Sequence, residues 1–406
     1  MTAAPEARKP SAMKMSARIP ASLDAFATEK LNALEAKNQR RRLVSSARTD
    51  GMAMRVEGGP ELISFTDNDY LGLSTHPEVI EAAREATSRF GAGAGASRLV
   101  TGNHPLYAAL EESLARIKGT EDACVFGSGY LANVGIIPTL VGAGDLIIAD
   151  ELVHTCIHAG MQLSKATVRF FRHSDVAHVR DILQAERASF GRALIVVDGV
   201  YSMDGDIAPL KELGALAADY DTWLMNDDAH ALGTIGSGRG SAHACDAAHL
   251  VPLQMGTLSK AVGSYGGYLA ASEPVVDLMR TRARSFIYTT GLPPAAVGAA
   301  IKALELIEND AELVARPTRL AQGFAAALNL PRPETPIVPL VIGTESDALA
   351  ASAALAEQGF KVIAFRPPTV AEGTSRLRFS FSASHRDADV DRLIETCRAL
   401  GLGGNA

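Results

Sequence analysis

Apolar and polar positions follow a repeating arrangement along residues 76–300. Short runs of apolar residues, each the length of a strand, are separated by stretches in which apolar residues have helical spacing. Apolar runs without alternation are typical of strands buried on both faces, and helices between them cover a largely parallel sheet. We therefore predict an α/β domain, with helices beginning near Pro77 and Pro105. The predicted strands span 123–126, 146–149, 168–171, 194–198, 223–227, 253–257 and 267–271.

The flanking segments follow other patterns. Residues 1–20 are small, polar and proline-containing and indicate a loose arm, whereas 22–42 have the apolar spacing of a helix. A β meander (52–55 and 62–65) is expected next, around a turn at 58–60. After Pro293-Pro294 an alanine-rich helix (295–307) leads into a small α+β lobe. There we predict strands over 337–342, 361–365 and 376–382, and helices over 346–358 and 387–400.

We accordingly expect three parts: an N-terminal arm, helix and β segment over 1–62, a large catalytic domain over 63–297 and a small C-terminal domain over 298–406. A chain of 406 residues exceeds what one hydrophobic core usually supports, and 47% hydrophobic with 21% charged residues is an ordinary globular balance.

Charge and cysteine content exclude several classes of protein. The net charge of −7 comes without the basic stripe that a nucleic-acid surface needs. Four scattered cysteines without a CxxC pair argue against a disulfide framework or a metal site. The N-terminus lacks the apolar stretch of a secretory signal, and no apolar run approaches the roughly 18 residues of a membrane span. We expect a soluble, cytoplasmic protein.

Three polar clusters stand at the ends of predicted strands. They are residues 198–205 (DGVYSMDG), 226–233 (NDDAHALG) and 256–260 (GTLSK). In open α/β sheets ligands bind beyond the carboxyl ends of the strands, so these clusters are expected to converge on one crevice.

The residues of these clusters have complementary chemistry. Lys260, which follows hydroxyl-bearing Thr257 and Ser259, suits an imine with an aldehyde cofactor. Asp227 suits a protonated pyridine nitrogen, and His230 could reach a ring hydroxyl. Residues 127–133 (GSGYLAN) follow a strand and open a helix, whose free N–H groups attract a phosphate. Each feature alone also fits a surface lysine, a solvated turn or a plain connector, but their combination and order favour a cofactor site.

The order of SGYLAN, His154, DGVYSMDG, DDAH and TLSK resembles the fold-type I pyridoxal-phosphate enzymes, and more narrowly the α-oxoamine synthases. The resemblance covers about 22–400 and includes 68–73 (NDYLGL), 90–98 (FGAGAGASR) and 288–294 (YTTGLPP). It implies an aspartate aminotransferase-like fold, pyridoxal 5'-phosphate as the cofactor, and condensation of an amino acid with an acyl thioester with loss of carbon dioxide.

The resemblance also implies roles for individual residues. Lys260 would hold the cofactor and act as the base at the substrate Cα, Asp227 would pair with the pyridine nitrogen, and His154 would stack on the ring and bind the developing oxyanion. Arg378 would bind the amino-acid carboxylate, with Asn68 on the substrate side. The remaining cofactor-binding residues would be Ser128, Gly129, Tyr130, Ser202, His230 and Thr257, with Thr289 or Thr290 from the neighbouring subunit of a homodimer.

Residues 366–370 (RPPTV) and 372–378 (EGTSRLR) most resemble the biotin-pathway branch, which joins L-alanine to a pimeloyl thioester of coenzyme A or acyl-carrier protein. Arg366 and Thr369 would then lie near the substrate, and Arg40, in the basic run 40–42, is a candidate partner for the far carboxylate. Arg366 could equally be a surface arginine, and the basic run a solvated helix end. Residues 264–268 (SYGGY) are similar to some members of the sphingolipid branch, so the sphingolipid, haem and aminooxobutyrate branches stay open.

Functions of other classes are less consistent with the sequence. A non-catalytic pyridoxal-phosphate sensor would normally carry a DNA-binding segment, and 1–60 has no helix-turn-helix signal. The glycine-rich stretch 91–96 follows a helix, whereas a dinucleotide fingerprint follows a strand; we interpret it as an active-site loop, with a plain connector as the alternative. The GxSxG motif that is typical of one class of hydrolases is absent from the sequence.

Overall fold

The computed structural model describes residues 21–36, 40 and 43–404, in two compact units divided between Ser46 and Ala47. The described part of the first unit contains α1 (Ala21–Ala36), which confirms the predicted helix as far as Ala36. None of its residues is buried. The predicted arm 1–20 and two arginines of the basic run, Arg41 and Arg42, lie outside the described residues.

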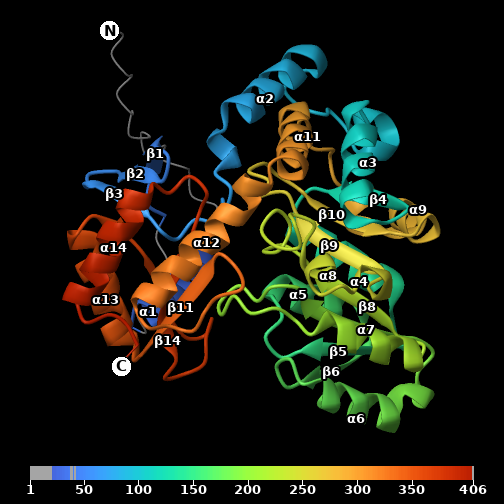
Figure 1. The fold of residues 1–406 in the computed structure, drawn as a ribbon. Helices are drawn as coiled ribbons and strands as arrows, with labels where there is room; N and C mark the ends of the chain where they lie inside the picture. The colour runs from blue at the N-terminus through green and yellow to red at the C-terminus, as the bar shows by residue number, and fades with distance from the viewer. Residues whose placement is uncertain (1–20, 37–39, 41–42, 405–406) are drawn as a thin grey trace. The chain divides into compact units, whose positions relative to one another are not determined.

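Seven strands form the central sheet of the second unit, in the order β4-β10-β9-β8-β7-β5-β6 (Figure 1). β10 is antiparallel to both of its neighbours, and the other neighbouring pairs are parallel. All seven strands predicted for this region are confirmed. Their bounds are β4 Asp122–Phe126, β5 Leu146–Asp150, β6 Thr167–Phe171, β7 Ala193–Asp198, β8 Trp223–Asp227, β9 Leu253–Thr257 and β10 Gly267–Ala271.

Helices cover both faces of this sheet, because successive side chains of a strand point to opposite faces. Ile147 of β5 packs in a cluster with α4 (Gly129–Leu140) and α5 (Thr155–Ser164), whereas its neighbour Ile148 packs with α6 (Val176–Glu186) and α7 (Leu210–Asp219). The sheet is therefore the middle layer of an α/β/α sandwich. The short helices α8 (Ser241–Ala244), α9 (Glu273–Arg282) and α10 (Arg284–Ile287) complete the region.

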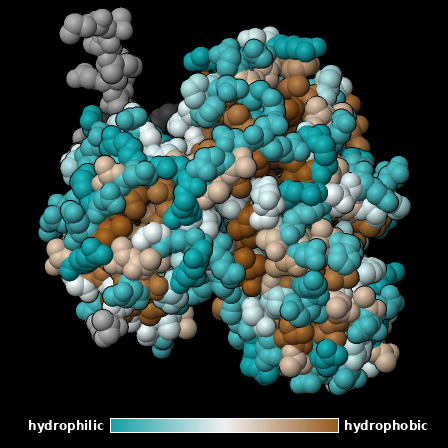
Figure 2. Space-filling model, in the orientation of Figure 1, coloured by the Kyte–Doolittle hydropathy of each residue, from teal (hydrophilic) through white to brown (hydrophobic). Residues whose placement is uncertain are grey.

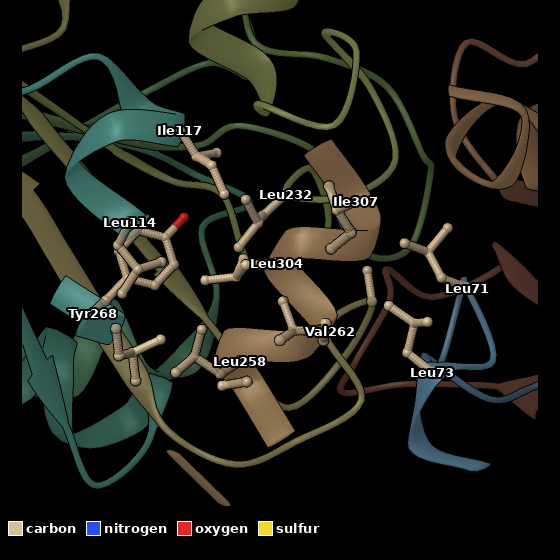
Figure 3. Packing of buried hydrophobic residues seen from close by; sticks show 14 of the residues in the cluster. Leu71, Leu73, Leu114, Ile117, Leu232, Leu258, Val262, Tyr268, Leu304 and Ile307 are labelled. Atoms are coloured by element: carbon tan, nitrogen blue, oxygen red, sulfur yellow. The ribbon is translucent and has the colours of Figure 1, made fainter. Parts of the chain in front are cut away.

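A further cluster joins the sheet to the helix that follows it in the chain. α11 (Pro294–Asn309) packs beside α2 (Pro77–Phe90) and α3 (Leu106–Lys118). Figure 3 shows Leu304 and Ile307 of α11 among buried side chains from other elements, Tyr268 of β10 included. The alanine-rich sequence of α11 leaves room for this close packing.

The remaining elements of the second unit form two smaller sheets around a phenylalanine-rich core. β11 (Ile337–Gly343), β14 (Ser375–Ser380) and β13 (Ile363–Phe365) form one sheet in that order. The other has the order β1 (Ser46–Asp50), β2 (Ala53–Val56), β3 (Glu61–Ser64) and β12 (Phe360–Lys361). α12 (Ala311–Ala327), α13 (Glu345–Glu357) and α14 (Asp387–Ala399) supply helices to this part of the fold, whose core includes Phe65, Phe324, Phe360, Phe379 and Phe381.

The prediction of a single strand over 361–365 is wrong. Phe360 and Lys361 pair with β3, whereas residues 363–365 pair with β14 in a different sheet. The strand β1 and the helix α12 were not predicted. The division of the chain at residues 62 and 297 stays a prediction.

Three general properties bear on function. All four cysteines are free thiols. Within residues 21–36, 40 and 43–404, no group of three or more His, Cys, Asp or Glu side chains is arranged to hold a metal ion, and no helix has the length and apolar character needed to cross a membrane. On the face shown in Figure 2, apolar areas are interspersed with hydrophilic ones.

Candidate active site

The carboxyl ends of β7, β8 and β9 meet at a cavity of about 230 Å³. Asp198 at the end of β7 is in register with Asp227 at the end of β8, and Lys260 follows β9 by three residues. The expected convergence of the polar clusters is thus what the fold shows. Eight of the predicted site residues line this cavity: Ser128, Gly129, Tyr130, His154, Asp227, His230, Thr257 and Lys260.

Of the lysines that the structure describes, only Lys260 lines this cavity, and its amine can be charged or neutral. Its Nζ lies 2.8 Å from Nε2 of His230. Burial lowers the pKa of Lys260 to about 8, although the negative charges of Asp227 and Asp198 oppose this shift. A substantial share of the amine is therefore neutral near pH 8, and only the neutral form is a nucleophile or a base.

Asp227 is a buried carboxylate that accepts hydrogen bonds from uncharged donors. Its Oδ2 accepts from the side-chain amide of Asn133 at 2.8 Å, and its Oδ1 from the backbone N–H of Ala229 at 3.0 Å. Neighbouring Asp198 has its pKa raised well above the usual range by burial and by the charge of Asp227. Asp227 can therefore bind a further cationic group from the cavity, such as a protonated ring nitrogen.

The adjacent Asp228 does not line the cavity. Its carboxylate is fully buried and forms a salt bridge with Lys118, which is also fully buried. Successive side chains at a strand end point to opposite sides, so only one aspartate of the DDAH motif can face a ligand. The structure places Asp227 in that position.

His154 caps α5, and this contact fixes its protonation pattern. Nδ1 of the ring accepts from the backbone N–H of Cys156 at 3.3 Å, and the Cys156 sulfur lies 2.8 Å from the same nitrogen. Burial lowers the pKa of His154, which favours the neutral ring. Since Nδ1 is the acceptor, the proton is on Nε2, and His154 can donate a hydrogen bond through that nitrogen.

The N-terminus of α4 forms one wall of the cavity. Ser128 caps the helix by accepting from the N–H of Leu131 at 3.1 Å, and the first N–H groups of any helix lack intrahelical partners. A Cβ at Gly267 would lie 2.4 Å from the carbonyl oxygen of Ser128, so glycine permits the close approach of β10. Thr257 adds a hydroxyl, 2.8 Å from that of Ser259. Helix N–H groups with nearby hydroxyls form a suitable site for a phosphate.

Three predicted residues do not line the cavity but are linked to it by hydrogen bonds. The buried Arg378 of β14 donates through Nε to the backbone carbonyl of Ser202 and through Nη2 to Oδ1 of Asn68, at 3.2 Å for the latter. Nη2 also donates to the hydroxyl of Tyr70 at 3.0 Å, and Tyr70 in turn contacts His230. Tyr70 was not singled out from the sequence, although it belongs to the NDYLGL motif.

Four other predicted residues of the second unit do not line this cavity, and a fifth lies in the first unit. Thr289 and Thr290 line a separate small cavity with Gly127 and Arg98, and Thr290 pairs with Ser97 in an isolated bridge. Arg366 and Thr369 form a turn, in which the N–H of Thr369 donates to the carbonyl of Arg366 at 3.0 Å. Arg40 belongs to the first unit, where it forms a 3.3 Å ion pair with Glu35.

Sequence reasoning did not assign six other residues that line the cavity: Cys156, Asp198, Val200, Ala229, Met255 and Ser259. Asp198 and Ser259 belong to motifs that the sequence did single out. No sequence motif pointed to Cys156. Burial raises the pKa of its thiol to about 12, so the thiol is protonated near neutral pH and is not a nucleophile here.

The donor set fits pyridoxal phosphate. An amine of lowered pKa suits the aldehyde, a buried carboxylate suits the ring nitrogen, and a helix N-terminus with hydroxyls suits the phosphate. Together with the mostly parallel sheet, these features define a fold-type I pyridoxal-phosphate enzyme.

Residues 60–396 match the aminotransferase class I and II family, and the chain belongs to that family. It is 60% identical to a putative 8-amino-7-oxononanoate synthase of Acidiphilium cryptum (92% of this chain, 97% of that protein). It is 61% identical to an 8-amino-7-oxononanoate synthase of Methylocella silvestris (85% and 98%). These relatives are α-oxoamine synthases, the group that the motifs indicated.

Solved structures agree with the fold. A serine palmitoyltransferase of Sphingomonas wittichii superposes with a TM-score of 0.86 at 30% identity, covering 96% of this chain and 100% of that one. An 8-amino-7-oxononanoate synthase of Francisella tularensis gives a TM-score of 0.72 at 26% identity, covering 84% and 98%. Another similar structure, at 30% identity, is a serine palmitoyltransferase with pyridoxal phosphate.

Proposed function

We propose that this protein condenses L-alanine with a pimeloyl thioester, with loss of carbon dioxide, to form 8-amino-7-oxononanoate in biotin biosynthesis. The observation that carries the proposal is the set of relatives with that enzyme's name, which are 55–61% identical over 85–93% of this chain. The cavity supports it, because it combines the amine, carboxylate and phosphate-binding groups that such chemistry needs.

In this reaction the bound pyridoxal phosphate supplies an electron-withdrawing ring next to the Cα of the amino acid. Lys260 holds the cofactor and, once released, takes the Cα proton as a neutral amine. Asp227 keeps a negative charge beside the ring nitrogen. His154 donates its Nε2 proton to the thioester oxygen as negative charge develops there, a contact of the kind that contributes roughly 3–4 kcal/mol to transition-state stabilisation.

The other site residues bind and orient the reactants. Ser128, Gly129, Tyr130 and Thr257 bind the phosphate, and Arg378 binds the alanine carboxylate. Nε and Nη2 of Arg378 already donate to protein groups, so the carboxylate binds at Nη1, which has no hydrogen-bond partner in the described part of the chain.

We also propose a cytoplasmic homodimer in which Thr289 or Thr290 completes the phosphate site of the neighbouring subunit. Both threonines lie outside the cavity of their own chain. Exposed apolar side chains support a contact surface there. Tyr288, next to Thr289, is 76% exposed, and Leu99 and Val100, which follow the bridge partner Ser97 in the chain, are 59% and 73% exposed. Activity that is unchanged on dilution to a monomer would contradict this arrangement.

The decisive experiment compares kcat/KM for pimeloyl, palmitoyl, succinyl and acetyl thioesters, each with alanine, serine and glycine. We expect the highest value for pimeloyl thioester with alanine. Coenzyme A and acyl-carrier protein forms of the pimeloyl donor are compared in the same series. Alanine variants of Arg366, Thr369 and Arg40 then test whether these residues bind the acyl chain, because loss would be confined to the pimeloyl donor.

A serine palmitoyltransferase activity is the second candidate. It is favoured by the higher structural similarity to that enzyme, a TM-score of 0.86 against 0.72. A preference for palmitoyl thioester with serine would establish it, and succinyl thioester with glycine would indicate the haem branch. A protein that binds the amino acid without releasing carbon dioxide from any pair would be a sensor.

A further inference from the structure

Four buried or partly buried side chains form an unbroken chain of hydrogen bonds from Arg378 to Lys260. Nη2 of Arg378 lies 3.0 Å from the Tyr70 hydroxyl, which lies 2.6 Å from Nδ1 of His230. Nε2 of His230 lies 2.8 Å from Nζ of Lys260. Tyr70 is fully buried, and it connects an arginine of the three-stranded sheet with the lysine that follows β9.

The direction of these bonds follows from the donors and acceptors. Arg378 can only donate, so the Tyr70 oxygen accepts from it and has one proton left to give. The possible acceptors of that proton are Nδ1 of His230 at 2.6 Å and Oδ1 of Asn68 at 3.3 Å. A separation of 2.6 Å is typical of an O–H donor and shorter than N–H bonds usually are. Tyr70 therefore donates to His230.

This contact fixes the proton of His230 on the nitrogen that faces Lys260. Burial lowers the pKa of His230 well below its usual value, so the ring is neutral and carries one proton. With Nδ1 as the acceptor from Tyr70, the proton is on Nε2, and His230 donates to Lys260. An ammonium has no lone pair to accept that bond, whereas a neutral amine has one.

We propose that Tyr70 is a positioning residue which, by fixing the proton of His230 on Nε2, favours the neutral amine of Lys260. The inference rests on the proposed use of pyridoxal phosphate, because a neutral amine is what binds the aldehyde and later takes the Cα proton. It gives Tyr70 a role in the reaction without direct contact with the reactants.

The other charged and titratable groups around Lys260 act in both directions. Asp227 of β8 and Asp198 of β7 favour the ammonium, as does any thiolate at Cys156, whereas the positive charge of Arg378 disfavours it. His154, near the start of α5, interacts electrostatically with Lys260 as well. Tyr70 therefore counteracts two carboxylates that would otherwise hold the proton on the amine.

The chain of hydrogen bonds from Arg378 to Lys260 is compatible with a bound substrate. Asn68 and Tyr70 both accept from Nη2 of Arg378, and Ser202 accepts from Nε. A carboxylate that binds at Nη1 leaves the contact with Tyr70 in place. The donor chain to Lys260 thus persists while the amino acid is held.

The test is the pH dependence of cofactor capture by the full-length, cofactor-free protein. Wild type and Tyr70→Phe are mixed with pyridoxal 5'-phosphate from pH 6.5 to 10, and the growth of the visible absorption band gives the capture rate. Loss of one hydrogen bond is worth about fivefold in an equilibrium constant, so we expect capture by Tyr70→Phe to be roughly fivefold slower below pH 8 and equal to wild type at pH 10. Borohydride reduction and peptide mapping confirm that Lys260 is the residue modified.

Tyr268→Phe is the matched control. Tyr268 is also fully buried, and its hydroxyl has no hydrogen-bond partner among the described residues, so its pH profile should match wild type. A Tyr70→Phe profile that is slowed equally at every pH would indicate a purely structural role and overturn the inference, as would an unchanged profile. The assay contains neither amino acid nor thioester, so its result is independent of which substrates the enzyme prefers.

Discussion

The two aspartates of the DDAH motif are neighbours in the chain but lie in opposite environments. Asp228 has a complete set of protein partners: Lys118 contacts one oxygen, and Asn226 and Ser241 donate to the other. Among the described residues, Asp227 has only uncharged hydrogen-bond donors, and it faces a cavity that it shares with a second carboxylate.

The difference separates charges that stabilise the fold from charges that act on a ligand. The cluster of Asp228, Lys118, Asn226 and Ser241, which we call the closed cluster, leaves no charge uncompensated. The open cluster of Asp227, Asp198, His154, His230 and Lys260 contains groups whose pKa values are displaced by burial and by each other, as at Lys260 and Asp198. Displaced pKa values in a cavity are typical of functional sites.

The largest effect is expected at Lys260, the amine of the open cluster. Lys260→Ala should lower kcat/KM by about 10⁴-fold or more, because the cofactor attachment and the general base are lost together. The variant should remain folded, and near-UV circular dichroism of variant and wild type checks this. Retention of a visible absorption band that borohydride removes would show that another lysine binds the cofactor.

Exchanging each aspartate for asparagine tests the comparison directly. Asp227→Asn should reduce kcat by roughly 10²–10³-fold, because a neutral partner no longer favours the charged ring. Its unfolding midpoint should hardly change, since one of two neighbouring carboxylates is neutralised. Near-normal turnover in this variant would mean that Asp227 is misassigned.

Asp228→Asn should lower the stability of the fold and leave turnover nearly unchanged, the reverse of what is expected for Asp227→Asn. Lys118 would keep a buried charge without its counter-ion, a loss worth about 3–5 kcal/mol in the free energy of unfolding. Urea denaturation measures this loss, and turnover per folded molecule should remain within severalfold of wild type. A large drop in turnover at unchanged stability would reverse the assignment of the two aspartates.

The smallest effect is expected at His173. Like the closed cluster it pairs with carboxylates, but its side chain is partly exposed to solvent. It contacts Asp150 at 3.1 Å and Asp206 at 2.8 Å, and these hydrogen bonds raise its pKa to about 10. Because the folded pKa is the higher one, the resulting stability is fully present below about pH 6.5 and is lost as the pH rises through about 10.

The measurement is urea denaturation of wild type and His173→Gln at pH 6.5 and pH 10.5. Since His173 is partly exposed to solvent, the wild-type advantage at pH 6.5 should be at most about 1 kcal/mol, and it should largely vanish at pH 10.5. An advantage of the same size at both pH values would show that His173 acts by packing alone.

The large sheet was predictable largely because strands such as β5 and β7 are buried on both faces and give nearly uninterrupted apolar runs. The polar motifs after β7, β8 and β9 could be assigned to one site because parallel strands end at the same edge of a sheet. The sequence did not predict β1, whose residues Ser46–Asp50 are mostly polar, or the division of 361–365 between two sheets. That division depends on pairing with β3 and β14, which lie far apart in the chain.

Long-range contacts account for what sequence reasoning missed in the site. Lys118 pairs with Asp228 across 110 residues, and Tyr70 meets Arg378 across 308. Neither spacing leaves a local pattern. Likewise, nothing in the sequence alone indicated that Arg378 would have two of its three nitrogens occupied by protein groups.

Arg378 belongs to a three-stranded sheet with its own phenylalanine-rich core, whereas Asp227 ends a strand of the seven-stranded sheet and Lys260 follows another. The segment that joins these regions at the site is short: Ser202 accepts from Arg378, and Asp204 forms an ion pair with Arg376. We therefore expect substrate range and cofactor binding to be separable. Substitutions around β13 and β14 should change which substrates are accepted while the cofactor-binding residues stay unaltered, so selectivity engineering is best directed to these strands.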